Sequence, residues 1–152
     1  MLMIAEFDPV HPERLISEPK CLSRPLYGFE NTAHTINNEG PYAFYYHNKI
    51  YLAYSGGDAR GYLYAIGMLT ANDGDDLCDL SVWEKAKTPI ASFATIPGEY
   101  GPGHNSFFWD RDQNLWIAYH AVTSFEEKIV SSGMRRVYFE QDKTPRVDVI
   151  VE

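Results

Sequence analysis

The 152-residue chain lacks several features that mark particular classes of protein. Its two cysteines, Cys21 and Cys78, form no metal or redox motif, so we interpret them as unrelated free thiols, with a single disulfide as the alternative. The longest apolar runs are only a few residues, and no membrane-spanning segment is predicted. Residues 1–8 lack the basic and long apolar regions of a signal peptide. The sequence therefore leaves the location open, and the cytoplasm is expected only if the chain is complete.

Positive charge is also scarce. Lys and Arg together number 13 against 21 Asp and Glu, which gives a formal net charge of -8. No basic patch stands out, and this argues against a nucleic-acid partner, whose phosphates require cationic side chains. The acidic balance says little about a neutral partner such as a sugar. Because no low-complexity segment or linker divides the chain, we expect one domain.

Aromatic side chains, by contrast, are abundant at 14% of the residues, which favours β-strands over helices. Short alternating or apolar runs are separated by turn signals such as Gly56-Gly57-Asp58-Ala59-Arg60-Gly61. We predict strands over residues 42–46, 50–55, 62–70, 107–109, 115–121, 134–140 and 146–151. No helix is predicted, although residues 73–87 could hold a turn. The predicted class is therefore all-β.

The two clearest hairpins repeat each other at an offset of 65 residues. Ile50-Tyr51-Leu52-Ala53-Tyr54-Ser55 overlays Leu115-Trp116-Ile117-Ala118-Tyr119-His120, and the same offset brings Glu39 onto His104. A recurring unit of strand, turn and strand is typical of the blades of a β-propeller. Since the residue before the innermost strand of a blade lies near the propeller axis, we predict that Glu39 and His104 face one axial cavity.

Both residues lie in contexts that constrain the backbone. Gly40-Pro41 directly follows Glu39 and would present its carboxylate on a stiff strand edge, where Asn38 could hydrogen-bond a sugar hydroxyl or hold the carboxylate. Gly101-Pro102-Gly103 directly precedes His104 and permits unusual backbone paths. Taken alone, each residue is better explained as a solvated turn glutamate or a satisfied structural histidine. The repeat favours a site, because it places an acid and an imidazole around one axis.

Several segments together resemble glycoside hydrolase family 43. The resemblance rests on Asn38-Glu39-Gly40-Pro41, Tyr51-Leu52-Ala53-Tyr54-Ser55, Gly101-Pro102-Gly103-His104-Asn105-Ser106 and Tyr119-His120. They occur in the order and spacing of the C-terminal half of that family, and the resemblance extends from about residue 4 to about residue 147. The Asn-Glu-Gly-Pro and Gly-Pro-Gly-His-Asn motifs are specific in combination, whereas either alone would be weak.

This resemblance implies a five-bladed propeller that hydrolyses arabinose- or xylose-containing plant glycans with inversion. It implies that Glu39 is the general acid. It also implies that His104 binds a calcium or sodium ion on the propeller axis through water. It also implies that an arginine of the last blade, Arg135 or Arg136, lies near the sugar. Together with Asn38, these arginines are the predicted substrate-binding residues.

The chain departs from the family pattern because it lacks both further catalytic aspartates, the general base and the residue that tunes the acid. We therefore expect a partial β-propeller with about two four-stranded blades and a remnant of a third. Residues 1–36 would form the remnant, 37–103 one blade and 104–152 the last blade, within a single domain. The other carboxylates considered are all expected to be solvated in turns: Asp8, Asp58, Asp110 and Asp112.

Two functions stay open at this point. The chain is either the C-terminal part of a glycosidase that needs the missing blades, or a non-catalytic carbohydrate-binding or interaction module. Because two blades leave open strand edges and uncovered apolar faces, we predict self-association or a missing N-terminal propeller portion. The sugar, its linkage and the choice between exo and endo action are not specified. The remaining residues considered are interpreted as packing or loop positions: Trp83, Trp109, Trp116, Asp73, Asp75, Asp76, Glu99 and Tyr100.

Overall fold

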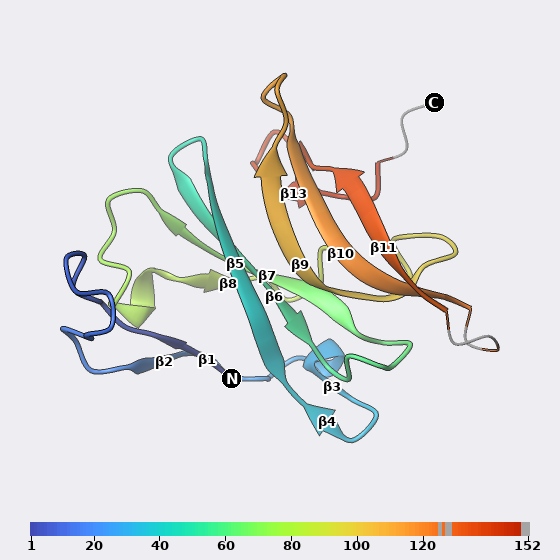
Figure 1. Ribbon diagram of the computed structural model, residues 1–152, viewed down its shortest axis with the longest axis horizontal. Coiled ribbons are helices and arrows are strands. Elements are labelled where there is room, and N and C mark those ends of the chain that lie inside the picture. The colour runs from blue at the N-terminus through green and yellow to red at the C-terminus, as the bar shows by residue number, and fades with distance from the viewer. Residues whose placement is uncertain (125, 127–128, 150–152) are drawn as a thin grey trace.

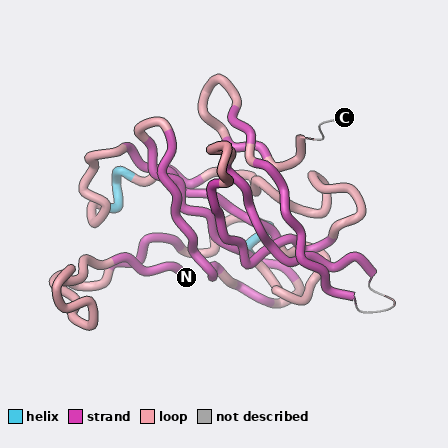
Figure 2. Tube along the Cα trace, turned by 45° about the horizontal axis from the view of Figure 1, so that its top comes forward, coloured by secondary structure: helices cyan, strands magenta, loops and turns pink. Residues whose placement is uncertain are grey.

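A computed structural model describes residues 1–124, 126 and 129–149 of the chain. Strands and the loops between them make up nearly all of it (Figure 2), and the all-β prediction is confirmed. The helical residues it describes are two short 3-10 turns, Gly28–Glu30 and Leu80–Val82. The strands are β1 Leu2–Ile4, β2 Lys20–Ser23, β3 Asn31–Thr32, β4 Thr35–Ile36, β5 Asn38–Tyr46, β6 Lys49–Gly56, β7 Ala65–Asn72, β8 Glu84–Lys85, β9 Tyr100–Trp109, β10 Leu115–Ser124, β11 Ile129–Arg136, β12 Tyr138–Phe139 and β13 Pro145–Arg146. Among the described residues, no helix has the length and hydropathy of a membrane-spanning segment.

One antiparallel sheet contains four strands in the order β5-β6-β7-β8. The turn between β5 and β6 consists of His47 and Asn48, which both have positive φ angles, 47° and 63°. A two-residue turn of this kind matches the right-handed twist of the strands that it joins. It sets the register of the hairpin, in which Tyr46 pairs with Lys49.

A second antiparallel sheet contains β9, β10 and β11, and it lies beside the first (Figure 1). The two sheets pack through a core of aromatic and aliphatic side chains. At its centre, Phe44 stacks on Tyr51 with a ring-centroid distance of 4.9 Å, and it contacts Phe107 of the second sheet at 4.5 Å. Burial of these faces between the sheets provides the main driving force for their association.

The strand-turn-strand repeat recurs in the structure, since β5 and β6 correspond to β9 and β10 at the predicted offset. The sheets are open rather than closed into a ring. The first sheet has the four strands expected of a blade, whereas the second has three, and β12 with β13 forms a separate pair. The predicted boundary between residues 103 and 104 falls inside β9. The number and bounds of the blades stay a prediction.

Two strand predictions near the C-terminal end differ from the structure. The strand predicted over 134–140 is divided between β11, which ends at Arg136, and β12, which begins at Tyr138, and the buried Val137 lies between them. Of the strand predicted over 146–151, only Arg146 lies in a strand, and residues 150–151 lie outside the described residues. Cys21 and Cys78 are free thiols, as interpreted from the sequence.

The carboxylate of Glu30 is fully buried behind the first sheet, with 0% of the residue exposed. Five donors surround it: Leu26 N, Tyr27 N, Asn38 Nδ2, Tyr54 Oη and Lys85 Nζ. Burial alone would raise the pKa of Glu30, but the hydrogen bonds from Lys85, Tyr27, Tyr54 and Leu26 outweigh it and lower the pKa from its ordinary 4.5. Glu30 is therefore an ionised residue that joins β5, β6 and β8 from inside the fold.

We predict that Glu30→Gln lowers the free energy of unfolding by about 3 kcal/mol, because it leaves the Lys85 ammonium without its buried partner. The stability from Glu30 is present above pH 4.5, the ordinary pKa, and is lost as the pH falls through the lowered pKa of the folded state. Urea unfolding between pH 3 and 7 should therefore show the largest difference between wild type and variant at neutral pH. Glu140→Gln, which removes a half-exposed ion pair with Arg146, is the control, with an expected loss below about 1 kcal/mol. Equal losses in both variants would contradict the prediction.

Candidate active site

Glu39 is the second residue of β5, where a bulge interrupts the pairing with β6 between Glu39 and Tyr42. Gly40 has a φ angle of +57°, a conformation that glycine adopts without strain. The bulge and this glycine turn the half-buried Glu39 side chain toward Tyr64. The hydroxyl of Tyr64 donates a hydrogen bond of 2.7 Å to Oε1 of Glu39.

The side chain of Asn38 lies elsewhere, because successive residues of a strand face opposite sides. It is only 2% exposed and donates to Oε1 of Glu30 at 2.8 Å, while its Oδ1 accepts from the hydroxyl of Ser23 at 3.0 Å. These contacts occupy the Asn38 side chain inside the fold, and its predicted role in substrate binding stays a prediction. Asn38 anchors the start of β5 and thereby fixes the backbone that carries Glu39.

The Gly-Pro-Gly-His motif forms the first part of β9, next to Tyr64. A Cβ atom at Gly103 would lie 2.0 Å from Cε1 of Tyr64, and one at Gly101 would lie 2.3 Å from the carbonyl oxygen of Gly61. No side chain fits at either position. Both glycines of the motif are therefore required, one to admit the Tyr64 ring and the other to admit the loop that carries it.

His104 follows with a φ angle of +52°, and its imidazole is exposed. A Cβ atom built on Gly40 would lie 3.5 Å from Nδ1 of His104, so the imidazole sits directly over the residue that follows Glu39. The imidazole of His104 therefore lies next to the backbone that carries Glu39, and the convergence of the two side chains on one axial cavity stays a prediction.

Three further residues belong to this site, and the sequence predicted a site role for none of them. Tyr64 is fully buried and immediately precedes β7; its ring lies parallel to that of His120, with centroids 5.7 Å apart. The ring of His120 is 6.4 Å from that of His104. Ser55 accepts a 2.7 Å hydrogen bond from the backbone N–H of His104, and it pairs with Glu39 across β5 and β6. The alternation of side chains along the second hairpin could have predicted that His120 faces the site. No local sequence pattern predicts a site role for Tyr64 or Ser55.

The local environment keeps Tyr64 protonated. Burial raises the pKa of its phenol, and the neighbouring Glu39 carboxylate raises it further, while the hydrogen bond with Ser55 acts in the opposite direction. Tyr64 is therefore a hydrogen-bond donor over the whole physiological pH range. The hydrogen bond from Tyr64 can hold the carboxyl group of Glu39 in one orientation. The imidazole of His120 lies next to the Tyr64 ring, and that of His104 follows it.

The two candidate arginines are adjacent in β11 and so occupy opposite faces of the sheet. Arg135 donates to Glu99 at 3.0 Å and to Tyr119 at 2.8 Å. Arg136 is exposed and lies over the ring of Tyr138, 5.0 Å from its centroid. Neither arginine forms a salt bridge with Glu39 in the described part of the chain. Their predicted contact with a sugar is untested and stays a prediction.

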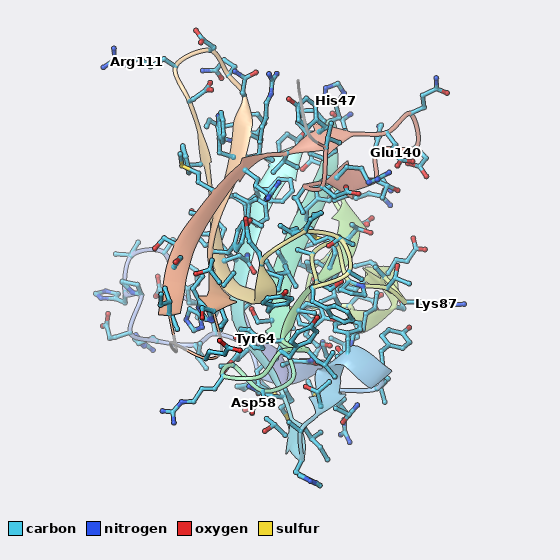
Figure 3. All side chains as sticks on the ribbon, turned by 90° about the vertical axis from the view of Figure 1, so that its right-hand side faces the viewer. His47, Asp58, Tyr64, Lys87, Arg111 and Glu140 are labelled. Atoms are coloured by element: carbon cyan, nitrogen blue, oxygen red, sulfur yellow. The ribbon has the colours of Figure 1, made fainter. Side chains whose placement is uncertain are left out.

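The other aspartates considered as a second carboxylate cap turns. Asp8 accepts from the backbone of Val10, and Asp58 accepts from the backbone of Arg60. Asp110 accepts from Trp116 and Asn114, and these hydrogen bonds lower its pKa to about 2. Arg111, in the same turn as Asp110 and Asp112, lies at the opposite end of the molecule from Tyr64 (Figure 3). This turn is therefore remote from Glu39.

A calcium or sodium ion beside His104 would need six to eight oxygen ligands in the case of calcium, and a single imidazole is a poor ligand for it. In the part of the chain that the structure describes, the side chains whose potential ligand atoms lie close enough together to share a metal ion are those of Glu6, Asp76 and Cys78. His104 is not among them. The residues beside His104 thus do not form a complete cage. The ion remains a prediction, and it would be held through water.

The remaining residues considered as packing or loop positions mostly have structural partners. Trp83 donates its ring N–H to the carbonyl of Leu77, and Trp109 stacks near Tyr46. Glu99 accepts from Arg135 and from the hydroxyl of Tyr119. In the acidic run, Asp73 accepts from Tyr45, Asp75 from the backbone of Asn72, and Asp76 from the backbone of Cys78.

Comparison with known proteins places this geometry in a family. The sequence profile described as Glycosyl hydrolases family 43 matches residues 3–145, nearly the whole chain. The chain belongs to glycosyl hydrolase family 43. Similar proteins include an extracellular exo-α-(1→5)-L-arabinofuranosidase of Streptomyces avermitilis, 28% identical over 93% of this chain, and one of Streptomyces chartreusis, 38% identical over 66% of this chain. The chain spans about a third of the length of these relatives, 31% and 30%.

Solved family 43 structures share its fold. An α-L-arabinofuranosidase from Lactobacillus brevis superposes with a TM-score of 0.81 at 29% identity, over 95% of this chain and 46% of that one. A thermostable family-43 glycoside hydrolase superposes with a TM-score of 0.77 at 26% identity, with the same coverage. The chain therefore corresponds to somewhat less than half of each of these two proteins.

We predict that Gly103→Ala lowers the free energy of unfolding by about 2 kcal/mol or more, because its methyl group overlaps the buried Tyr64 ring. Urea unfolding measures the loss, and the near-ultraviolet circular dichroism of the tyrosines should change with it. Gly28→Ala is the matched control, since no atom lies within 4 Å of a Cβ at that position. A stability change for Gly103→Ala as small as that of the control would contradict the packing described above.

Proposed function

We propose that this family 43 chain supplies the proton-donating half of a glycosidase site that acts on arabinose- or xylose-containing glycans. Glu39 is the general acid, which protonates the glycosidic oxygen as the bond to the sugar breaks. The observation that carries this proposal is the hydrogen bond from Tyr64 to Glu39 beside His104, at the junction of the two family motifs. The names of the similar arabinofuranosidases support the sugar class.

Inverting hydrolysis also requires a general base, a carboxylate roughly 6.5–9.5 Å from the acid across the sugar. The aspartates Asp8, Asp58, Asp110 and Asp112 are engaged in turns, and among the described residues none of them hydrogen-bonds Glu39. We therefore propose that the base comes from propeller blades outside this chain or from another subunit. Glu39 would work with that base only when both border the same cavity.

A non-catalytic carbohydrate-binding or interaction module is the second candidate. The observation in its favour is the same lack of a facing carboxylate among the described residues. In that case Glu39 and His104 would contact a glycan without cleaving it. Binding without turnover distinguishes this candidate from the first.

We predict that Glu39→Gln abolishes most of any nitrophenol release from 4-nitrophenyl α-L-arabinofuranoside or β-D-xyloside, because an amide cannot donate the required proton. General acid catalysis contributes about 10²–10⁴-fold, so a loss of that order is expected. Continuous absorbance measurement of nitrophenolate detects it. The matched control is Glu140→Gln. It removes an exposed carboxylate in the turn between β12 and β13 and should leave the rate unchanged.

Full activity in Glu39→Gln would refute the acid assignment. Absence of turnover in the wild type, together with calorimetric binding of an arabino-oligosaccharide, would favour the non-catalytic module. In that case, loss of binding in Glu39→Gln but not in Glu140→Gln would locate the glycan at the same site.

We also predict self-association through the outer face of the second sheet. Val130 and Met134 of β11 are 64% and 61% exposed, and an apolar sheet face of this kind is a liability for a monomer. Sedimentation velocity should show a species larger than the monomer, which Val130→Lys with Met134→Lys shifts toward the monomer. Ile36→Lys, at an equally exposed apolar residue of β4, is the control and should leave the distribution unchanged. A purely monomeric wild type would contradict the prediction.

A further inference from the structure

We propose that Tyr64 is a positioning residue that holds Glu39 by one carboxyl oxygen, Oε1, and thereby leaves Oε2 to carry the transferable proton. This inference rests on the proposed role of Glu39 as the general acid. It concerns the orientation of the acid, which neither motif specifies.

The hydrogen bond itself decides which oxygen is free. The hydroxyl of Tyr64 donates to Oε1 of Glu39 at 2.7 Å. When a carboxyl group is protonated, one oxygen carries the hydrogen and the other acts as acceptor. Since Oε1 is already the acceptor of the Tyr64 hydroxyl, the proton of the neutral acid belongs on Oε2. The donor to the leaving group is then one defined atom rather than either of two.

Tyr64 can impose this choice because its ring cannot turn away. The ring is fully buried, it occupies the space where a side chain at Gly103 would lie, and the ring of His120 lies parallel to it. The residue comes from the segment before β7, whereas Gly103 and His120 belong to the second sheet. The packing of the two sheets thus fixes the direction of the Glu39 carboxyl.

A second hydrogen bond holds the strand pair that carries Glu39. The N–H of His104 donates to Oγ of Ser55 at 2.7 Å, and Ser55 pairs with Glu39 across β5 and β6. The backbone of the Gly-Pro-Gly-His loop is in this way connected to the same strand pair from which Glu39 accepts the hydrogen bond of Tyr64.

The first test measures the bond without any need for activity. With ¹³C-labelled tyrosine, NMR should detect a Tyr64 hydroxyl proton that exchanges slowly with water because the ring is buried. Glu39→Gln should shift this signal upfield, since a neutral amide oxygen is a weaker acceptor than a carboxylate. Tyr64→Phe should remove it. Tyr51→Phe, which deletes another buried hydroxyl donating to the carbonyl of Lys143, should leave it in place.

The second test measures the consequence for proton donation. For any turnover of the wild type, Tyr64→Phe should lower kcat about tenfold on a glycoside with a poor leaving group, and less than about threefold on the dinitrophenyl glycoside, which needs little acid assistance. Tyr51→Phe should not change the ratio of the two rates. A merely structural effect of Tyr64→Phe would lower both rates together.

The outcomes separate the two proposals. A Tyr64 hydroxyl signal that does not respond to Glu39→Gln, or equal rate losses on both substrates in Tyr64→Phe, would overturn the positioning role while leaving Glu39 as the acid. Full activity in Glu39→Gln would instead overturn the acid assignment, whatever the NMR signal shows. An upfield shift in Glu39→Gln with a leaving-group-dependent loss in Tyr64→Phe would support both.

Discussion

The buried carboxylate of Glu30 holds the beginning of β5 in place, and everything in the candidate site follows from that placement. An ionised group in the interior is tolerated only when donors replace the water that it has lost. Glu30 meets this condition with five donors from separate parts of the chain, among them Asn38 and Lys85. Because Asn38 faces inward to Glu30, the next residue, Glu39, must face the other way, toward Tyr64 and the second sheet.

The glycines of the two motifs have a common physical explanation. Gly40 adopts a positive φ angle and lies under the imidazole of His104, and Gly103 leaves room for the ring of Tyr64. Gly40 of the first motif thus makes room for His104 of the second motif. Gly103 of the second motif makes room for Tyr64, which hydrogen-bonds Glu39 of the first motif. The pairing of motifs 65 residues apart reflects two sheets that interlock at one point.

The carboxylates of this family 43 chain differ in the number of donors that they accept, and the difference separates structural from chemical roles. Glu30 is saturated by donors, and Asp110 is held by Asn114 and Trp116, so both are locked as anions. Among the residues that the structure describes, Glu39 accepts one side-chain hydrogen bond, from the hydroxyl of Tyr64 to Oε1. A group that must gain and lose a proton needs such a free oxygen, because full hydrogen bonding to the anion would oppose protonation.

The sequence alone determined the all-β class, the hairpin formed by residues 42–46 and 50–55, and the repeat that relates this hairpin to the second one. These features depend on the two-residue period of strands and on local turn chemistry, which neighbouring residues reveal. Only the tertiary structure decided that Asn38 faces the interior, that Glu30 is buried and ionised, and that Tyr64 and Ser55 join the acid to the second sheet. The partners of these residues lie far away in the chain, 55 positions in the case of Glu30 and Lys85. Such contacts are set by a strand bulge and by the packing of one sheet on another, and no local pattern encodes them.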